Sequence, residues 1–248
     1  MVKTARVLEP FIKIPLNYKA HDQQNKKYFH AMTIPILFED DDIIAANKPD
    51  GIATIPGSEQ GKDTLLGLLS AQYSQKIFVV HRLDKDVSGV ILFAKNAAAH
   101  KSLNDQFFNR TIRKTYMALV YGSVEKREGS ISKPIHKFGS GRMGVDEIRG
   151  KPSCTEYEVI EELPEYSLVK AYPKTGRRHQ IRVHFYSIGH SIAGDTHYGD
   201  KSAMKPFPRM MLHAHSITFK LQNGEEKTVD CPLPESFTTV LEGLRKIP

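Results

Sequence analysis

The chain has 248 residues, of which 40% are hydrophobic and 25% are charged. These proportions are ordinary for a globular protein and exclude disorder, a collagen repeat or a coiled coil as a description of the whole chain. Lys and Arg number 35 and Asp and Glu 28, so the formal net charge is +7. This charge permits a polyanionic partner without proving one.

The excess positive charge is concentrated in the middle of the chain. Residues 101–150 carry 10 basic and 5 acidic side chains, whereas residues 1–50 carry 7 of each and residues 151–200 carry 6 basic and 7 acidic ones. Such a concentration is either a solvated Lys and Arg face or a nucleic-acid-binding surface, and charge alone does not decide between them.

Several classes of protein are disfavoured by what the sequence lacks. Cys154 and Cys231 are far apart and form no CxxC pair, which argues against a disulfide scaffold and a cysteine zinc site. No apolar run approaches the roughly 18 residues of a membrane span, and the first residues lack the apolar stretch of a secretory signal. We therefore expect a reduced, cytoplasmic protein with no membrane association.

The first half of the chain predicts an extension followed by strands and two helices. We interpret residues 1–32 as an N-terminal extension and residues 33–248 as one domain. Asp63 and Asn96 are the expected helix N-caps. The expected elements are strands at 34–38, 43–46, 78–80 and 90–93, and helices at 63–73 and 96–108, the second with an apolar stripe of Ala98, Leu103, Phe107 and Phe108.

The second half adds strands, one helix and a basic, glycine-rich loop. We expect strands at 116–121, 155–160, 167–172 and 210–221, a hairpin loop at 133–152, and a helix from Arg178 to Ser187 with Gly189 as its C-cap. Strands and helices follow one another without strict βα alternation. The predicted fold class is therefore α/β (α+β), with a mixed, largely antiparallel sheet flanked by helices.

The segment HRLDKDVSG, residues 81–89, is a charged loop between two apolar strands. Asp84 has Arg82 two residues before it and Lys85 directly after it. Nearby cations favour the ionised form of a carboxyl group, so Asp84 is a candidate nucleophile or base. The alternative is a structural turn in which Asp86 and Ser88 cap backbone donors.

A second basic segment, KTGRRHQIRVH, covers residues 174–184. On a helix, Arg178 and Arg182 would share one face, and two like charges are easiest to tolerate there with an anion between them. His179 and Gln180 at the helix start could donate to a phosphate or a base edge. The alternative is an exposed basic helix face.

Metal and nucleotide-cofactor motifs are weak or missing. The chain has 11 histidines, but only His213 and His215 could share one face of a strand, and no HExxH pattern accompanies them. Residues 139–144 formally match GxGxxG but lack the strand and helix that the dinucleotide fingerprint requires. We expect neither a metal nor a cofactor.

Taken together, the motifs resemble those of the RluA-type family of pseudouridine synthases. The match extends over roughly residues 34–234. The matching segments, in chain order, are NKPDG at 47–51, HRLD with SG at 81–89, KTYMALVYG at 114–122, KPS at 151–153, KTGR and HQIRVH at 174–184, Gly194-Asp195, Tyr198-Gly199 and LHA at 212–214.

The resemblance implies a reaction and a partner. The family isomerises uridine in RNA to pseudouridine, without cofactor or metal, in a cleft of a mixed antiparallel sheet. The expected partner is ribosomal or transfer RNA. The sequence indicates no obligate protein partner and is silent on oligomeric state, so a monomer is the default expectation. Many relatives carry an N-terminal S4-type RNA-binding domain, for which residues 1–32 are too few, so the RNA grip is expected to come from the catalytic domain.

The resemblance also assigns roles to individual residues. Asp84 is implied to be the essential carboxylate, acting at the ribose as a nucleophile or by removing a proton. Tyr116 is implied to stack on the target base, Arg182 to pair with the carboxylate, and Arg82 to help extrude the nucleotide. The residues expected to contact RNA are His81, Arg82, Leu83, Arg110, Arg113, Lys114, Arg177, Arg178, His179 and Gln180.

Two other functions are compatible with parts of this pattern. One is a non-catalytic RNA-binding protein that assists RNA folding on the same fold. The other is a glycoside hydrolase that uses Asp84 and Asp86, although carboxylates two residues apart on a loop do not define the separation which that chemistry needs.

Overall fold

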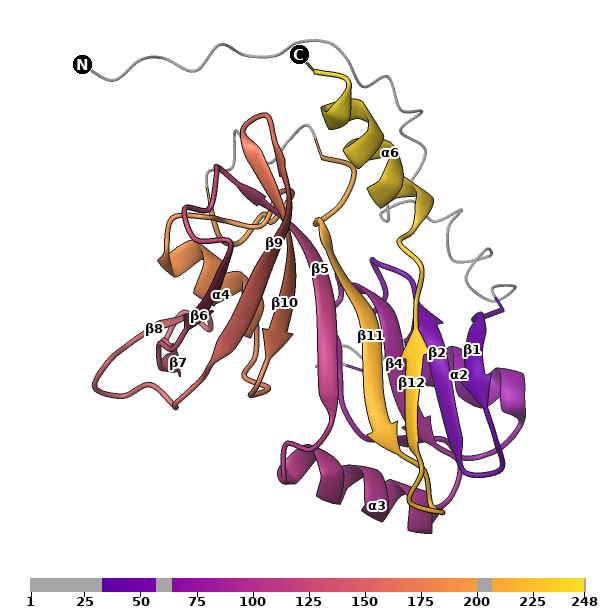
Figure 1. The fold of residues 1–248 in the computed structure, drawn as a ribbon. Coiled ribbons are helices and arrows are strands. Elements are labelled where there is room, and N and C mark those ends of the chain that lie inside the picture. Colours follow the sequence, from indigo (N-terminus) through magenta and orange to yellow (C-terminus); the bar gives the residue numbers. More distant parts are fainter. Residues whose placement is uncertain (1–32, 57–63, 200–206, 248) are drawn as a thin grey trace, which may run out of the picture.

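A computed structural model describes residues 33–56, 64–199 and 207–247, so the expected extension and the expected cap Asp63 lie outside the described residues. Figure 1 shows a broad sheet with helices around it. The elements are β1 (Ile36–Glu39), β2 (Ile43–Lys48), α2 (Leu65–Tyr73), β3 (Phe78–Val79), β4 (Ser88–Ala94), α3 (Ala97–Phe108), β5 (Arg113–Tyr121), β6 (Glu128–Ile131), β7 (Ile135–Lys137), β8 (Met143–Val145), β9 (Thr155–Leu163), β10 (Tyr166–Pro173), α4 (Gln180–Ser187), β11 (Leu212–Lys220), β12 (Glu226–Asp230) and α6 (Glu235–Arg245).

The main sheet has ten strands in the order β1-β2-β4-β11-β5-β10-β9-β6, with β3 paired to β4 and β12 to β11. Among its described pairings only β4 and β11 run parallel, and they meet where His213 faces Ser88 and Ala214 faces Gly89. The predicted mixed, largely antiparallel sheet flanked by helices is therefore confirmed. The parallel contact joins the two halves of the sheet at Ser88 and Gly89, the last two residues of the HRLDKDVSG segment.

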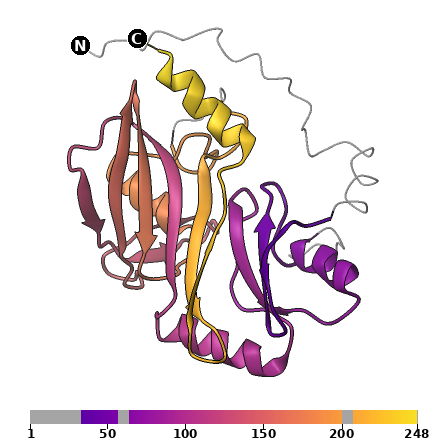
Figure 2. The same cartoon turned by 45° about the vertical axis from the view of Figure 1, so that its right-hand side comes forward.

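The two faces of β5 separate the core from the C-terminal helix. Met117 and Leu119 pack with Phe237 of α6, whereas Ala118 belongs to the large core cluster that includes Phe185 of α4. This follows from the period of two along a strand, which sends successive side chains to opposite faces. Helix α6 lies at one end of the cartoon and α3 at the other in both views (Figures 1 and 2). Tyr116 and α4 thus lie on the face opposite α6.

The predicted strands and helices are present, with three differences. The helix expected from Arg178 begins at Gln180, because His179 adopts a left-handed conformation with φ of 56°. Arg178 therefore precedes the helix, and the prediction that it shares a helix face with Arg182 is wrong. The strands β6 and β12 and helix α6 had not been predicted.

The third difference concerns the apolar stripe of α3. Asn96 caps this helix as expected, accepting from the backbone N–H of Ala99 at 2.9 Å. Leu103 is buried, but Ala99 is buried in place of Ala98, and the Phe108 side chain is 86% exposed. The helix turns a narrower stripe to the core than its sequence indicates, because α3 lies across one end of the sheet, near β3, β4 and β11, and only one of its sides is covered.

A glycine permits the parallel contact between β4 and β11. Gly89 has φ of 117°, and a Cβ atom there would overlap the backbone nitrogen and oxygen of Ala214. We expect Gly89→Ala to lower the free energy of unfolding by about 1–3 kcal/mol or more, because the strands must separate to admit the methyl group. Urea denaturation would measure this. Gly243→Ala, a helical position with open space around it, is the matched control and should not destabilise; equal stability of both variants would contradict the account.

Candidate active site

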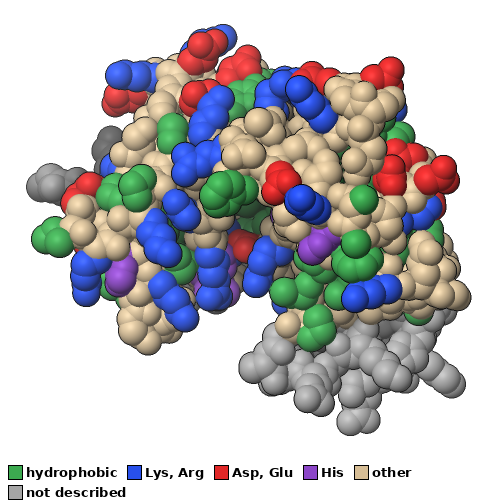
Figure 3. Space-filling view, turned by 90° about the horizontal axis from the view of Figure 1, so that it is seen from below, with side chains coloured by type: hydrophobic (Ala, Val, Ile, Leu, Met, Phe, Trp, Pro, Cys, Tyr) green, Lys and Arg blue, Asp and Glu red, His purple; other side chains and the backbone are tan. Residues whose placement is uncertain are grey.

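A cleft of about 590 Å³ opens on the face of the sheet opposite α6. Its walls are the loop after β3, the end of α3, the start of β5, and the turn leading into α4. Eleven of the thirteen predicted site residues line it; Arg113 and Arg178 do not. Figure 3 shows Lys and Arg side chains gathered around a hollow on the lower face of the molecule.

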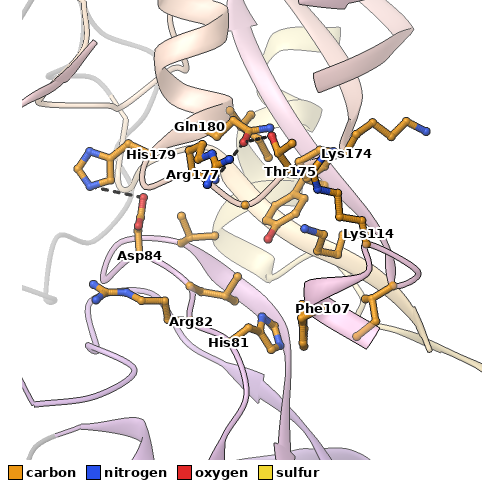
Figure 4. A pocket seen from close by; sticks show the side chains of 18 of the residues that line it. His81, Arg82, Asp84, Phe107, Lys114, Lys174, Thr175, Arg177, His179 and Gln180 are labelled. Carbon is orange, nitrogen blue, oxygen red and sulfur yellow. Dashed lines mark hydrogen bonds and ion pairs between the residues drawn. The ribbon is translucent and has the colours of Figure 1, made fainter. Parts of the chain in front are cut away.

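Asp84 projects into this cleft from the loop between β3 and β4. Its side chain is 21% exposed, and its Oδ2 accepts a hydrogen bond from Arg182 Nη1 at 3.1 Å. His179 Nε2 lies 3.7 Å from the same oxygen (Figure 4). No described residue bonds to Oδ1. One carboxylate oxygen is therefore held by the protein while the other is free to act on a substrate.

The loop that carries Asp84 is fastened on both sides of it. Thr54 Oγ1 donates to the Leu83 carbonyl at 2.9 Å and accepts from the Leu83 amide at 3.2 Å. The Lys48 side chain, 0% exposed, donates to the carbonyls of Lys85 and Val87 at 2.9 and 2.7 Å. These bonds fix the backbone around Asp84. Neither Thr54 nor Lys48 had been predicted as a site residue, although Lys48 belongs to the NKPDG match.

Arg182 is the centre of a buried ion pair that the predicted site did not include. Its guanidinium donates twice to Asp195, at 2.6 Å through Nε and 2.8 Å through Nη2. Burial lowers the pKa of Arg182, but the hydrogen bonds and charges of Asp195 and then Asp84 outweigh burial and raise it. Arg182 thus stays charged and points Nη1 at Asp84. The only sequence signal for Asp195 was the Gly194-Asp195 match.

His179 reaches Asp84 because of its unusual backbone. Its left-handed conformation places the ring beside the carboxylate, with Nδ1 2.8 Å from the Tyr198 hydroxyl. Burial lowers the pKa of His179 to about 4, and burial raises the pKa of Tyr198. Both groups are therefore neutral at neutral pH. The carboxylate 3.7 Å from Nε2 favours the tautomer with its proton on that nitrogen, and in this tautomer Nδ1 accepts from the Tyr198 hydroxyl.

Tyr116 lines the cleft from β5, two residues after Lys114 on the same side of the strand. Burial, with the nearby charge of Asp84, raises the pKa of its hydroxyl. The phenol is therefore protonated at neutral pH and presents a neutral, half-buried ring to whatever occupies the cleft.

Three residues predicted to contact RNA are either paired within the protein or lie outside the cleft. The side-chain nitrogen of Gln180 donates to Cys154 O and Thr155 Oγ1. Its side-chain oxygen accepts from the Thr175 hydroxyl and from the backbone N–H of Arg177. Its hydrogen-bonding capacity is thus used within the protein, where it ties the turn before α4 to β9. Arg113 forms an exposed ion pair with Glu226. Arg178 is exposed outside the cleft.

Among residues 33–56, 64–199 and 207–247, no group of three or more His, Cys, Asp or Glu side chains is arranged to hold a metal ion. None of their helices is long and apolar enough to cross a membrane.

Comparison with known proteins identifies the family. A family model described as RNA pseudouridylate synthase matches residues 42–187. The chain is 36% identical to ribosomal large subunit pseudouridine synthase D of Nitrosomonas europaea, over 96% of this chain and 72% of that protein. It is 37% identical to the dual-specificity RNA pseudouridine synthase RluA of Vibrio cholerae, over 75% of this chain and 77% of that one.

The fold also matches a solved structure of a pseudouridylate synthase domain protein. Human RNA pseudouridylate synthase domain containing 1 superposes with a TM-score of 0.70 at 28% identity, covering 87% of this chain and 96% of that chain. The fold and the matches therefore define an RNA-modifying isomerase. The chain belongs to the RNA pseudouridylate synthase family, whose members convert uridine to pseudouridine, and the resemblance found in the sequence is confirmed.

The Arg182 ion pair can be tested through its buried partner. We expect Asp195→Asn to lower the free energy of unfolding by about 3–5 kcal/mol, because a buried guanidinium loses its charged partner. Pseudouridine formation should fall roughly 100-fold, since Arg182 would no longer be held against Asp84. Thermal denaturation and an RNA modification assay measure the two effects.

The matched control for this variant is Glu226→Gln. It breaks the exposed ion pair with Arg113, and exposed pairs contribute little to stability. An Asp195→Asn protein as stable and active as this control would contradict the role of the buried pair.

Buried histidines make stability depend on pH. Burial lowers the pKa of His213 to about 4 and that of His81 to about 3. As the pH falls below 6.5 the unfolded chain takes up these protons first, so the free energy of unfolding should fall between pH 6.5 and 4, by about 1.4 kcal/mol per pH unit for each histidine. Urea denaturation across this range would show the slope. His213→Asn should reduce it by one histidine's share; an unchanged slope would contradict the assignment.

Proposed function

We propose that the chain isomerises a uridine of ribosomal RNA to pseudouridine, with Asp84 as the catalytic residue. The observation that carries the proposal is the state of the Asp84 carboxylate, with Oδ2 held by Arg182 and Oδ1 free in a basic cleft. The matched relative from Nitrosomonas europaea is named for the ribosomal large subunit. The Vibrio cholerae relative is named as dual-specificity, so transfer RNA is the second substrate to test.

The cleft suits an RNA strand because of its charge. The cations Arg82, Arg110, Lys114, Lys174 and Arg177 line it together with Arg182, around the single carboxylate of Asp84. Arg182 is neutralised by Asp195, and Lys174 pairs with Glu156, which leaves Arg110, Lys114 and Arg177 to meet phosphates. Phosphate contacts supply affinity and register without reading sequence.

In the proposed reaction the target uridine leaves the base stack and enters the cleft. Extruding a nucleotide costs a few kcal/mol, which contacts to the backbone and the base must offset. The exposed side chain of Arg82, two residues before Asp84, is placed to fill the space that the base vacates. The neutral ring of Tyr116 is the surface on which the uracil stacks.

Asp84 then acts at the ribose through its free Oδ1, as a nucleophile or by removing a proton. The N-glycosidic bond breaks, the uracil turns within the cleft, and its C5 bonds to the ribose. The C5 proton then leaves and N1 takes up a proton, so the product is an isomer of the substrate. The resemblance to the family assigns the assisting role to Tyr116, which is protonated at neutral pH and would pass a proton through its hydroxyl rather than act as a phenolate base. Arg182 keeps the carboxylate aimed throughout, because its own position is fixed by Asp195.

The direct test is Asp84→Asn, assayed on unmodified ribosomal and transfer RNA by chemical mapping of pseudouridine. We expect no detectable product, because the amide cannot act as a nucleophile or base at the ribose. Asp86→Asn, in the same loop but outside the lining of the cleft, is the control and should retain activity. Undiminished product from Asp84→Asn would remove Asp84 from the mechanism.

The alternative function, a non-catalytic protein that assists RNA folding, is not favoured, because the chain belongs to a family of isomerases. A gene-deletion strain separates the two functions. An Asp84→Asn protein that restored the phenotype of such a strain without restoring pseudouridine would support the RNA-folding role.

A further inference from the structure

The cleft extends past the residues to which the reaction assigns a role. Figure 4 shows Lys114 and Phe107 on the opposite side of the pocket from Asp84 and His179. We propose that this far end is a subsite for the nucleotide next to the target uridine, with its base on Phe108 and its phosphate between Lys114 and Arg110. The inference rests on RNA being the substrate, and it deepens the proposed function.

Phe108 provides the surface for a base. It is the last residue of α3, lines the cleft, and is 86% exposed. A single exposed aromatic side chain is not unusual in itself. This one stands at the mouth of a basic cleft, where a flat apolar face can stack on any base. A base that stacks on Phe108 would cover this exposed ring.

Lys114 provides an unpaired cation beside that surface. Burial lowers the pKa of its side chain to about 8, and no described carboxylate or carbonyl pairs with its Nζ. By contrast, Lys95 and Lys174 are paired with glutamates. A half-buried ammonium group without a partner is costly unless an anion arrives from outside. An RNA phosphate is such an anion, and it would raise the pKa of Lys114 on binding.

Arg110 adds a second cation to the same end of the cleft. It follows α3 in a left-handed conformation with φ of 58°, is exposed, and has no described carboxylate partner. Together Lys114 and Arg110 can hold one phosphate from two sides, which is the arrangement that fixes a strand in register.

His81 adds a neutral donor under this subsite. Its Nε2 accepts from the Leu92 amide at 2.9 Å, so its proton is on Nδ1, for which no described residue is an acceptor. Its ring packs against Phe107 with centroids 4.6 Å apart. A stacking face, two unpaired cations and a free N–H donor are the groups that recognise a nucleotide.

Binding of short oligonucleotides to the full chain tests the subsite without relying on activity. The probes are the trinucleotide UpUpU and two copies that each lack one terminal base, compared by competition against a labelled RNA. For the wild-type chain, loss of one terminal base should weaken binding about 5- to 150-fold, and loss of the other should change it little. The sensitive end shows whether the 5′ or 3′ neighbour occupies the subsite.

Substitutions then test whether this difference in binding affinity between the probes arises at the far end of the cleft. The Phe108→Ala variant should bind all three probes with equal affinity. The control is Ile148→Ala, at another apolar position, which is 94% exposed, and it should bind the probes like the wild type. Lys114→Gln should shallow the salt dependence of binding by about 0.7 in the log–log slope. Lys101→Gln, an exposed lysine of α3 outside the cleft, should leave the slope unchanged.

The outcomes separate the subsite from the proposed function. If the wild-type chain forms pseudouridine but Phe108→Ala and Lys114→Gln bind like their controls, the subsite is overturned and the function stands. If the probe differences appear but no RNA is modified, the subsite stands and the proposed reaction falls.

Discussion

The site depends on one guanidinium held between two carboxylates. Arg182 is fixed by two hydrogen bonds to buried Asp195, and its third donor points at Asp84. A guanidinium is planar and presents its donors in a rigid fork, so fixing one edge fixes the other. The buried pair therefore sets the position of a carboxylate that lies 98 residues away in the chain. A lysine could not transmit this orientation.

The sheet holds the two sides of this contact in place. Asp84 comes from the loop before β4, while Arg182 comes from α4, which packs over β9 and β10. These elements belong to opposite halves of the sheet, joined through β11. The close approach at Gly89, a few residues after Asp84, brings the halves together. The cleft lies over this join, which is why one strand of RNA can meet residues from both halves.

The charges of the cleft are divided between structure and function. Arg182 aligns Asp84, and Lys174 is paired with Glu156. Arg113, outside the cleft, is paired with Glu226. Lys114 and Arg110 remain without partners among the described residues. A count of basic residues therefore overstates the free positive charge. The few unpaired cations beside exposed Phe108 are the ones to which an RNA backbone can bind most favourably.

The sequence by itself determined the fold class and the family, because period-two strands and short contiguous motifs are local properties. It also predicted Asp84, Tyr116 and Arg182 as site residues, and the structure places all three in one cleft. Only the tertiary structure decided that Asp195 holds Arg182, that His179 faces Asp84, and where α4 begins. These depend on a left-handed residue and on contacts between distant segments, which local patterns do not encode. The exposure of Phe108 was decided in the same way: helical period alone places it in the apolar stripe, but the sheet covers only one side of α3.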